Sequence, residues 1–150
     1  MWFILLGSIL LISAAYAEGC NRSDFNYQSY KPDTFIGFYT GQSCGSINID
    51  HVVSLKDAYD SGAASWSASK KEFFANDRDN HVPSCGRVNS SKGSEGPSDF
   101  LRRSHDGKGL EYRIVRFCGY VQKYYAAKIK YGLSLKGNSE NTFATCGIGL

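Results

Sequence analysis

Apolar and polar residues alternate over residues 46–53, and this period of two predicts a β-strand. The strand ends with a carboxylate and an imidazole side by side, Asp50 and His51. A second strand is predicted over residues 81–85, where a proline confines it to an edge or a bulge. Residues 34–39 predict one further short strand. The chain therefore contains short strands, and helices lie between and after them.

Apolar residues three and four positions apart predict the longest helix, over residues 111–131. Gly132 supplies its C-terminal stop. A last short helix begins at Asn138 or Ser139, which are good N-cap residues, and ends at Cys146. The apolar stripe of the long helix consists of Ile114, Cys118, Val121, Tyr125 and Ile129.

Three shorter helices are predicted between these elements. The first covers residues 55–62, and the second begins at the N-cap Ser67 and runs through Ala75. The third is a short helix within the polar residues 87–93. The first helix is expected to expose Lys56, Asp57 and Asp60. The second is expected to pack on the core through Trp66, Phe73 and Phe74.

The first seventeen residues differ from the rest of the 150-residue chain. Residues 2–12 are apolar and uncharged, and small residues follow up to Ala17, which predicts a secretory signal peptide cut after that residue. The apolar run is shorter than the ~20 residues that span a bilayer, and no later segment is apolar enough to do so. We expect one secreted domain over residues 18–150, with no membrane partner.

All five cysteines lie after residue 17, and an oxidising compartment would pair them and leave one over. Cys118 lies on the apolar stripe and Cys146 ends the last helix, so we predict a Cys118–Cys146 disulfide that stabilises by roughly 3 kcal/mol. The pairing of Cys20, Cys44 and Cys85 stays open, although Cys44 and Cys85 both flank the two strands. A zinc site is the competing interpretation, but the chain has no Cys-x-x-Cys.

The net charge of +3 is unevenly distributed. Basic residues outnumber acidic ones over residues 99–136, whereas acidic residues outnumber basic ones over residues 50–79. A basic flank beside an acidic site suits a polyanion held next to a metal ion. A solvated helix face explains the same charges, and charge alone favours that explanation.

Asp50 and His51 point to opposite faces of their strand, so they can serve one reaction only in different roles. A neutral imidazole is the natural general base near pH 7, and a carboxylate is a ligand for hard cations. The ordinary alternative is a turn contact at the strand end. Asn89 follows the second strand and opens a helix, which adds a third polar side chain in the order strand, strand, helix.

This order resembles the ββα-metal motif of HNH, or His-Me finger, endonucleases. The chain is similar to the secreted HNH-type nucleases that are related to the C-terminal nuclease domain of GmrSD restriction systems. The resemblance covers about residues 48–146 and implies an α+β fold with a small ββα-metal core, added helices and stabilising disulfides. Its segments are Ile49–Ala58, Ser61–Ala63, Trp66, Phe74–Asp77, Asn89–Gly93 and Ala126–Leu133.

The resemblance implies a role for each site residue. His51 would be the general base that takes a proton from water. Asp50 and Asn89 would bind one divalent cation, Mg²⁺ or another such as Mn²⁺, through oxygen atoms. Lys92 would contact the substrate phosphate, with a solvated helix lysine as the alternative. His81 is expected to be structural or to lie on the surface.

The implied function is a secreted, metal-dependent endonuclease with little sequence specificity, with DNA as the expected substrate and RNA as an additional one. Phosphate contacts carry no base information, which fits low specificity. The alternative is a catalytically inactive secreted binding or effector protein of the same fold. Asn89 also begins an Asn-Ser-Ser glycosylation triplet, and Asn21 begins another. A glycan on Asn89 would block the metal site.

Overall fold

The computed structural model describes residues 19–100, 103–105 and 111–150, so the predicted signal peptide lies outside the described residues. The described chain is a small α+β protein with five α-helices and two two-stranded antiparallel sheets. In this part of the chain no helix is long and apolar enough to cross a membrane. The predicted α+β class is confirmed at this level.

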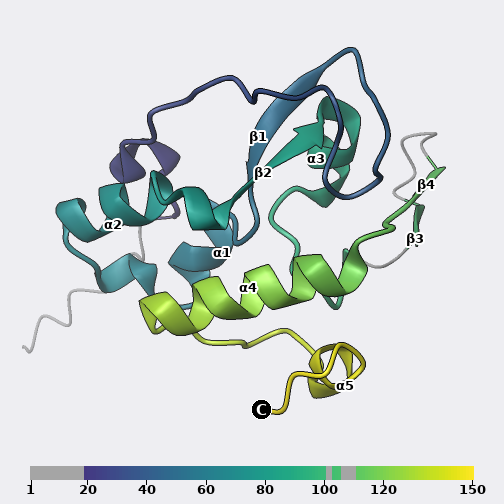
Figure 1. The fold of residues 1–150 in the computed structure, drawn as a ribbon. Coiled ribbons are helices and arrows are strands. Elements are labelled where there is room, and N and C mark those ends of the chain that lie inside the picture. Colours follow the sequence, from purple (N-terminus) through teal and green to yellow (C-terminus); the bar gives the residue numbers. More distant parts are fainter. Residues whose placement is uncertain (1–18, 101–102, 106–110) are drawn as a thin grey trace, which may run out of the picture.

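The two strands predicted from the alternating pattern pair with each other. β1 (Ile47–His51) runs antiparallel to β2 (His81–Cys85), and His51 lies opposite His81. The helix α3 (Gly86–Lys92) follows β2 without a loop, so strand, strand and helix occur in the expected order (Figure 1). The carbonyl oxygen of Pro83 points away from β1 and accepts the Phe38 N–H at 2.7 Å. The nitrogen of the same residue points to the same side, so the missing N–H of proline removes no hydrogen bond between β1 and β2.

Two α-helices and two short 3₁₀ turns connect β1 to β2. α1 (Leu55–Asp60) begins at the N-cap Ser54, and α2 (Ala68–Ala75) begins at the predicted N-cap Ser67. The 3₁₀ turns are η2 (Ala63–Ser65) and η3 (Arg78–Asn80). A third 3₁₀ turn, η1 (Arg22–Phe25), precedes β1 in the chain and packs against α2.

Two side-chain predictions for α1 and α2 were wrong. Asp57 is not exposed, because its carboxylate accepts hydrogen bonds from Lys128 Nζ at 2.6 Å and the Tyr124 hydroxyl at 2.7 Å. Phe73 does not pack on the core, since 67% of it is exposed, whereas its neighbour Phe74 is fully buried. Both errors arose because sequence spacing does not show which face of a short helix meets a partner far along the chain.

The predicted helix over residues 111–131 begins later than expected. Residues Glu111–Arg113 form strand β4, which pairs with β3 (Arg103–His105), and helix α4 covers Phe117–Tyr131. Gly132 ends α4 in the left-handed conformation, as predicted. Ile129 is 57% exposed, so the predicted stripe does not continue to the end of the helix. The buried face of α4 is instead Phe117, Tyr120, Val121, Tyr124, Ala127, Lys128 and Tyr131.

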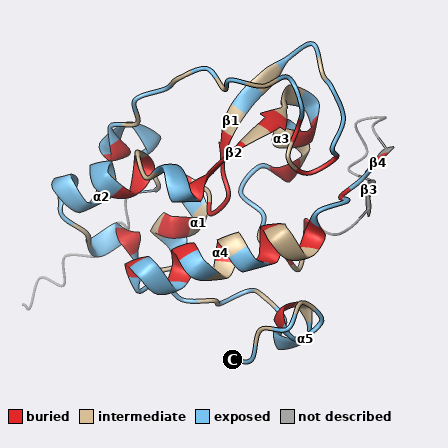
Figure 2. Cartoon of the chain, in the orientation of Figure 1, coloured by how far each residue is buried: buried red, intermediate tan, exposed pale blue. Residues whose placement is uncertain are grey.

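The core lies between α4 and the segments around β1. Buried residues concentrate at the end of β1 and along one side of α4 (Figure 2). Aromatic rings fill much of this space: Tyr120 packs against both Tyr39 and Phe100 at centroid distances of 5.4 and 5.7 Å. This packing fixes the end of β1, where Asp50 and His51 lie.

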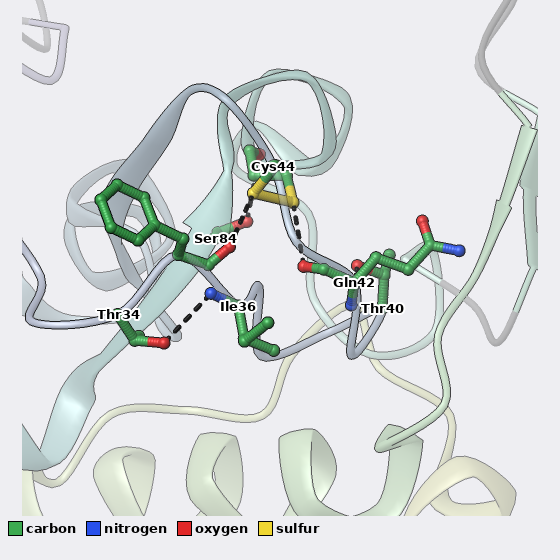
Figure 3. Close-up of a disulfide and its surroundings, with 8 residues drawn as sticks. Thr34, Ile36, Thr40, Gln42, Cys44 and Ser84 are labelled. Carbon is green, nitrogen blue, oxygen red and sulfur yellow. Dashed lines mark hydrogen bonds between the residues drawn. A yellow bond between two sulfur atoms is a disulfide. The ribbon is translucent and has the colours of Figure 1, made fainter.

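Two disulfides cross-link the fold. Cys118–Cys146 is confirmed and ties α4 to the chain after α5 (Glu140–Ala144). Cys44–Cys85 joins the loop before β1 to the end of β2 (Figure 3), and Cys20 is free. The predicted strand over residues 34–39 is wrong, because this segment makes only an isolated bridge between Ile36 and Ser43.

Candidate active site

The end of β1 and the middle of α3 line one cleft. Its volume is about 570 Å³, and Asp50, His51 and Asn89 all contribute to its wall. Residues 39 positions apart, Asp50 and Asn89, meet there because β1 pairs with β2 and α3 follows β2 directly. The structure therefore brings together the three residues predicted to bind metal and to act as base.

Asp50 is a buried carboxylate with two strong donors. Its Oδ2 accepts the Tyr39 hydroxyl at 2.6 Å and lies 3.2 Å from Lys92 Nζ, whereas Oδ1 lies 3.4 Å from the same nitrogen. Burial raises the pKa of Asp50, and the Lys92 charge and the Tyr39 hydrogen bond oppose this rise. Oδ1 thus has the weaker contact of the two oxygens, on a side chain that lines the cleft.

Lys92 occupies a place that neither sequence interpretation anticipated. Its side chain is fully buried, and its Nζ donates to the carbonyl oxygen of His51 at 3.0 Å as well as to Asp50. A solvated helix lysine is therefore wrong. A direct phosphate contact stays a prediction, and in this geometry it would require the ammonium to leave Asp50. As the structure stands, Lys92 orients the carboxylate rather than the substrate.

His51 is held by one end of its ring. Its Nε2 lies 2.8 Å from the carbonyl oxygen of Ala75, the last residue of α2. A carbonyl only accepts, so Nε2 carries the proton and Nδ1 is left as the unprotonated nitrogen. Burial lowers the pKa of His51 to about 3, so the imidazole is neutral in its resting state. This is the charge state and tautomer that a general base needs.

His81 supports His51 from the neighbouring strand. The two rings pack edge to face at a centroid distance of 4.5 Å, and His81 Nε2 shares the Ala75 carbonyl at 3.0 Å. The Tyr30 hydroxyl donates to His81 Nδ1 at 3.1 Å, which fits the same tautomer. Burial lowers the pKa of His81 as well. His81 is buried, so it has the structural role that was one of the two expected. It lies beside His51 because the two residues are opposite each other in the β1–β2 pair.

Asn89 presents an uncommitted amide to the cleft. Its backbone carbonyl accepts the Gly93 N–H, but its side chain makes no hydrogen bond with any other described residue. One amide and one carboxylate oxygen fit Mg²⁺, which keeps several waters and takes few protein ligands. The described residues contain no group of three or more His, Cys, Asp or Glu that could hold a metal. The zinc interpretation therefore finds no support in them.

Two basic residues on the cleft wall were not predicted as site residues. Arg22 comes from η1, and Lys56 comes from α1, where its Nζ also lies 2.5 Å from Asp60. Lys56 was expected to be exposed, which is correct, but exposure alone gave no signal of a site. Arg22 had no sequence signal, because only the contact of η1 with α1 and α2 brings it to the cleft. The unpaired Cys20 lies on the same wall.

Comparison with known proteins gives limited information. No family model matches the chain, and no solved structure matches it. An uncharacterized secreted protein of Arthroderma benhamiae is 41% identical over 63 residues, which are 41% of this chain and 31% of that protein. The match thus covers less than a third of the relative's length. Together with the two disulfides, it agrees with the predicted location: the protein is secreted.

Proposed function

We propose that this protein is a secreted, divalent-metal-dependent endonuclease with a ββα-metal core. The observation that carries the proposal is the shared cleft: Asp50, His51 and Asn89 reach it from consecutive strand, strand and helix elements. The resemblance to HNH-type nucleases assigns the same three residues to one site. Metal-dependent hydrolysis of a phosphodiester bond uses a general base beside a metal ion. His51 would supply the base, and Asp50 and Asn89 would supply ligands for the metal.

His51 takes the proton from the attacking water through Nδ1. The Ala75 carbonyl holds the other nitrogen and lies at the C-terminal end of α2, where a helix favours positive charge. Burial makes the resting imidazole a weak base, with a pKa of about 3. An anionic phosphate in the cleft opposes that effect, so the basicity of His51 rises when substrate binds.

Asp50 and Asn89 would hold the metal, Mg²⁺ or a similar cation such as Mn²⁺. When bound, it would supply positive charge that offsets the negative charge developing on the reacting phosphate and its leaving oxygen. Tyr39 and Lys92, which do not line the cleft, fix the Asp50 carboxylate by hydrogen bonds. Lys92 is then a positioning residue, and its predicted phosphate contact is not needed for the reaction.

The substrate is nucleic acid: DNA, with RNA as an additional substrate. Arg22 and Lys56 lie on the cleft wall beside His51 and Asn89, where they can bind backbone phosphates. Such contacts position a strand without reading its bases, which predicts little sequence specificity.

A plasmid-nicking assay with Mg²⁺ tests this proposal. We expect His51→Ala to lower nicking by roughly 10²-fold to 10⁴-fold, the usual contribution of a general base. Asn141→Ala is a matched control, because Asn141 is exposed on α5. EDTA should abolish the activity of every variant. Equal nicking by the wild type and His51→Ala would refute the mechanism.

The second candidate function is a catalytically inactive, secreted binding protein. One observation favours it: the Lys92 ammonium already neutralises Asp50, in the place where a metal ion would do so. This candidate predicts no nicking by the wild-type protein with Mg²⁺, Mn²⁺ or Ca²⁺. It also tolerates a glycan on Asn89, which the nuclease proposal does not, and peptide mass mapping of the secreted protein detects such a glycan.

A further inference from the structure

A second hollow continues the candidate active site along β1. It has a volume of about 470 Å³, and we call it the aromatic groove, defined by Tyr27, Tyr30, Lys31, Phe35 and Asn48. Ile49 lines both this groove and the cleft that holds Asp50 and His51. The two hollows therefore share a wall residue directly beside the candidate catalytic pair.

Tyr27 links the groove to the general base. Its ring packs edge to face on His51 at a centroid distance of 4.6 Å. Tyr30 is fixed as well, because its hydroxyl bonds His81 and the Arg78 guanidinium lies 4.2 Å from its ring centroid. A ligand in the groove would thus contact Tyr27, which itself packs on His51, and would lie against side chains that are already ordered.

Phe35 supplies an aromatic face that nothing in the described chain covers. The side chain is 71% exposed, which is the largest exposure among the described large hydrophobic residues. Its loop is nevertheless anchored: the Cys44 N–H donates to the Phe35 carbonyl at 3.0 Å, and Cys44 is disulfide-bonded to Cys85 of β2 (Figure 3). An exposed ring on an anchored loop is suited to stacking, because little entropy is lost when a ligand binds.

We propose that the aromatic groove binds an unpaired nucleobase next to the scissile phosphate, so that the substrate class is single-stranded nucleic acid. This inference rests on the proposed nuclease function. Aromatic rings stack on bases of any sequence, Lys31 supplies charge for the adjoining phosphate, and the Asn48 amide can bond a base edge. Bases inside a duplex are stacked on one another and cannot enter the groove. Single strands are therefore cleaved in preference to duplexes.

Binding to a short, labelled, single-stranded oligonucleotide tests the groove without catalysis. The measurement uses His51→Ala protein, which cannot cleave the probe if the proposed function is right. We expect Phe35→Ala to weaken binding by roughly tenfold, the loss expected for one stacked base, and Phe35→Tyr to retain it. Phe73→Ala is the matched control, since Phe73 is similarly exposed at 67% but does not line the groove. An unchanged affinity for Phe35→Ala would overturn the inference.

Cleavage assays separate this inference from the proposed function. If the wild type cleaves single strands and duplexes equally well and Phe35→Ala changes neither rate, the groove inference fails while the nuclease proposal stands. If no substrate is cleaved but Phe35→Ala still weakens oligonucleotide binding, the nuclease proposal fails and the groove remains a base-binding site. If Phe35→Ala instead abolishes self-association of the chain in sedimentation experiments, the groove binds a second copy and the inference is overturned.

Discussion

Two buried lysine–aspartate pairs in this protein differ in their separation and in the hydrogen-bond partners of each aspartate. Lys128 and Asp57 lie 2.6 Å apart, and Ser61 and Tyr124 complete a hydrogen-bond network around them. Lys92 and Asp50 lie 3.2 Å apart, and Asp50 lines the open cleft. Both lysines are fully buried. The Lys128–Asp57 pair is the shorter one and has more hydrogen-bond partners, although the side chain of Asp57 is 13% exposed and that of Asp50 only 6%. The longer Lys92–Asp50 pair places its carboxylate in the cleft that His51 and Asn89 also line.

The largest expected effect on stability comes from breaking the Lys128–Asp57 pair. Lys128→Met removes the ammonium and leaves Asp57 charged in a largely buried site, so we expect a loss of about 3–5 kcal/mol in the free energy of unfolding. Urea denaturation followed by circular dichroism measures this loss. The control is Lys123→Met, which removes a charge from the same helix at a half-buried position. A similar loss for both variants would show that the network has no special role.

Breaking the Lys92–Asp50 pair should lower the free energy of unfolding by less, and a bound metal ion should offset part of the loss. In Lys92→Met, Asp50 keeps its Tyr39 hydrogen bond, and the lost contact is the longer one, 3.2 Å against 2.6 Å, so we expect a loss of about 2 kcal/mol. A cation bound at Asp50 replaces the missing charge, so Mg²⁺ should raise the Tm of this variant more than that of the wild type. Mg²⁺ should not restore Lys128→Met. Equal responses of the two variants to Mg²⁺ would remove the distinction between the pairs.

The buried histidines His51 and His81 make the free energy of unfolding sensitive to acid. The pKa of His51 is about 3 in the folded protein and near 6.5 when unfolded, so the unfolded state binds more protons between these values. Stability therefore falls as the pH drops from about 6.5 toward 3, by about 2 kcal/mol at pH 5, and His81 acts in the same direction. The raised pKa of Asp50 partly opposes this trend. Urea midpoints measured from pH 7 to pH 4.5 for the wild type and His51→Gln check it, because the variant should show a shallower loss.

The strand that carries the site could be predicted because its pattern is local. Alternation located β1, the Asp50–His51 dipeptide is adjacent in sequence, and a helix directly after β2 placed Asn89. The partners of the aspartates could not be predicted in this way. Asp50 meets Lys92 across 42 positions and Asp57 meets Lys128 across 71, and both contacts depend on how helices pack.

The long helix shows a different limit of sequence reasoning. Residues 111–114 fit the apolar stripe of a helix, yet 111–113 pair with residues 103–105 as a strand. The aromatic and β-branched residues near position 114 fit either structure, and a neighbouring strand decided between them. Cys118–Cys146 was still predicted correctly, because Cys118 lies within the helix under either start point.

The smallest expected change in stability belongs to Asn89, whose side chain has no hydrogen bond within the described chain. We expect Asn89→Ala to change the free energy of unfolding by less than about 0.5 kcal/mol, as at an ordinary surface position. The same variant should weaken binding of Mn²⁺, used as a paramagnetic substitute for Mg²⁺, by roughly tenfold, because it removes one of two protein ligands. Electron paramagnetic resonance titration measures free Mn²⁺ directly, with Asn141→Ala as the control. If Asn89→Ala binds Mn²⁺ as tightly as the wild type, Asn89 is not a ligand, and the Asp50 carboxylate alone cannot account for a metal site.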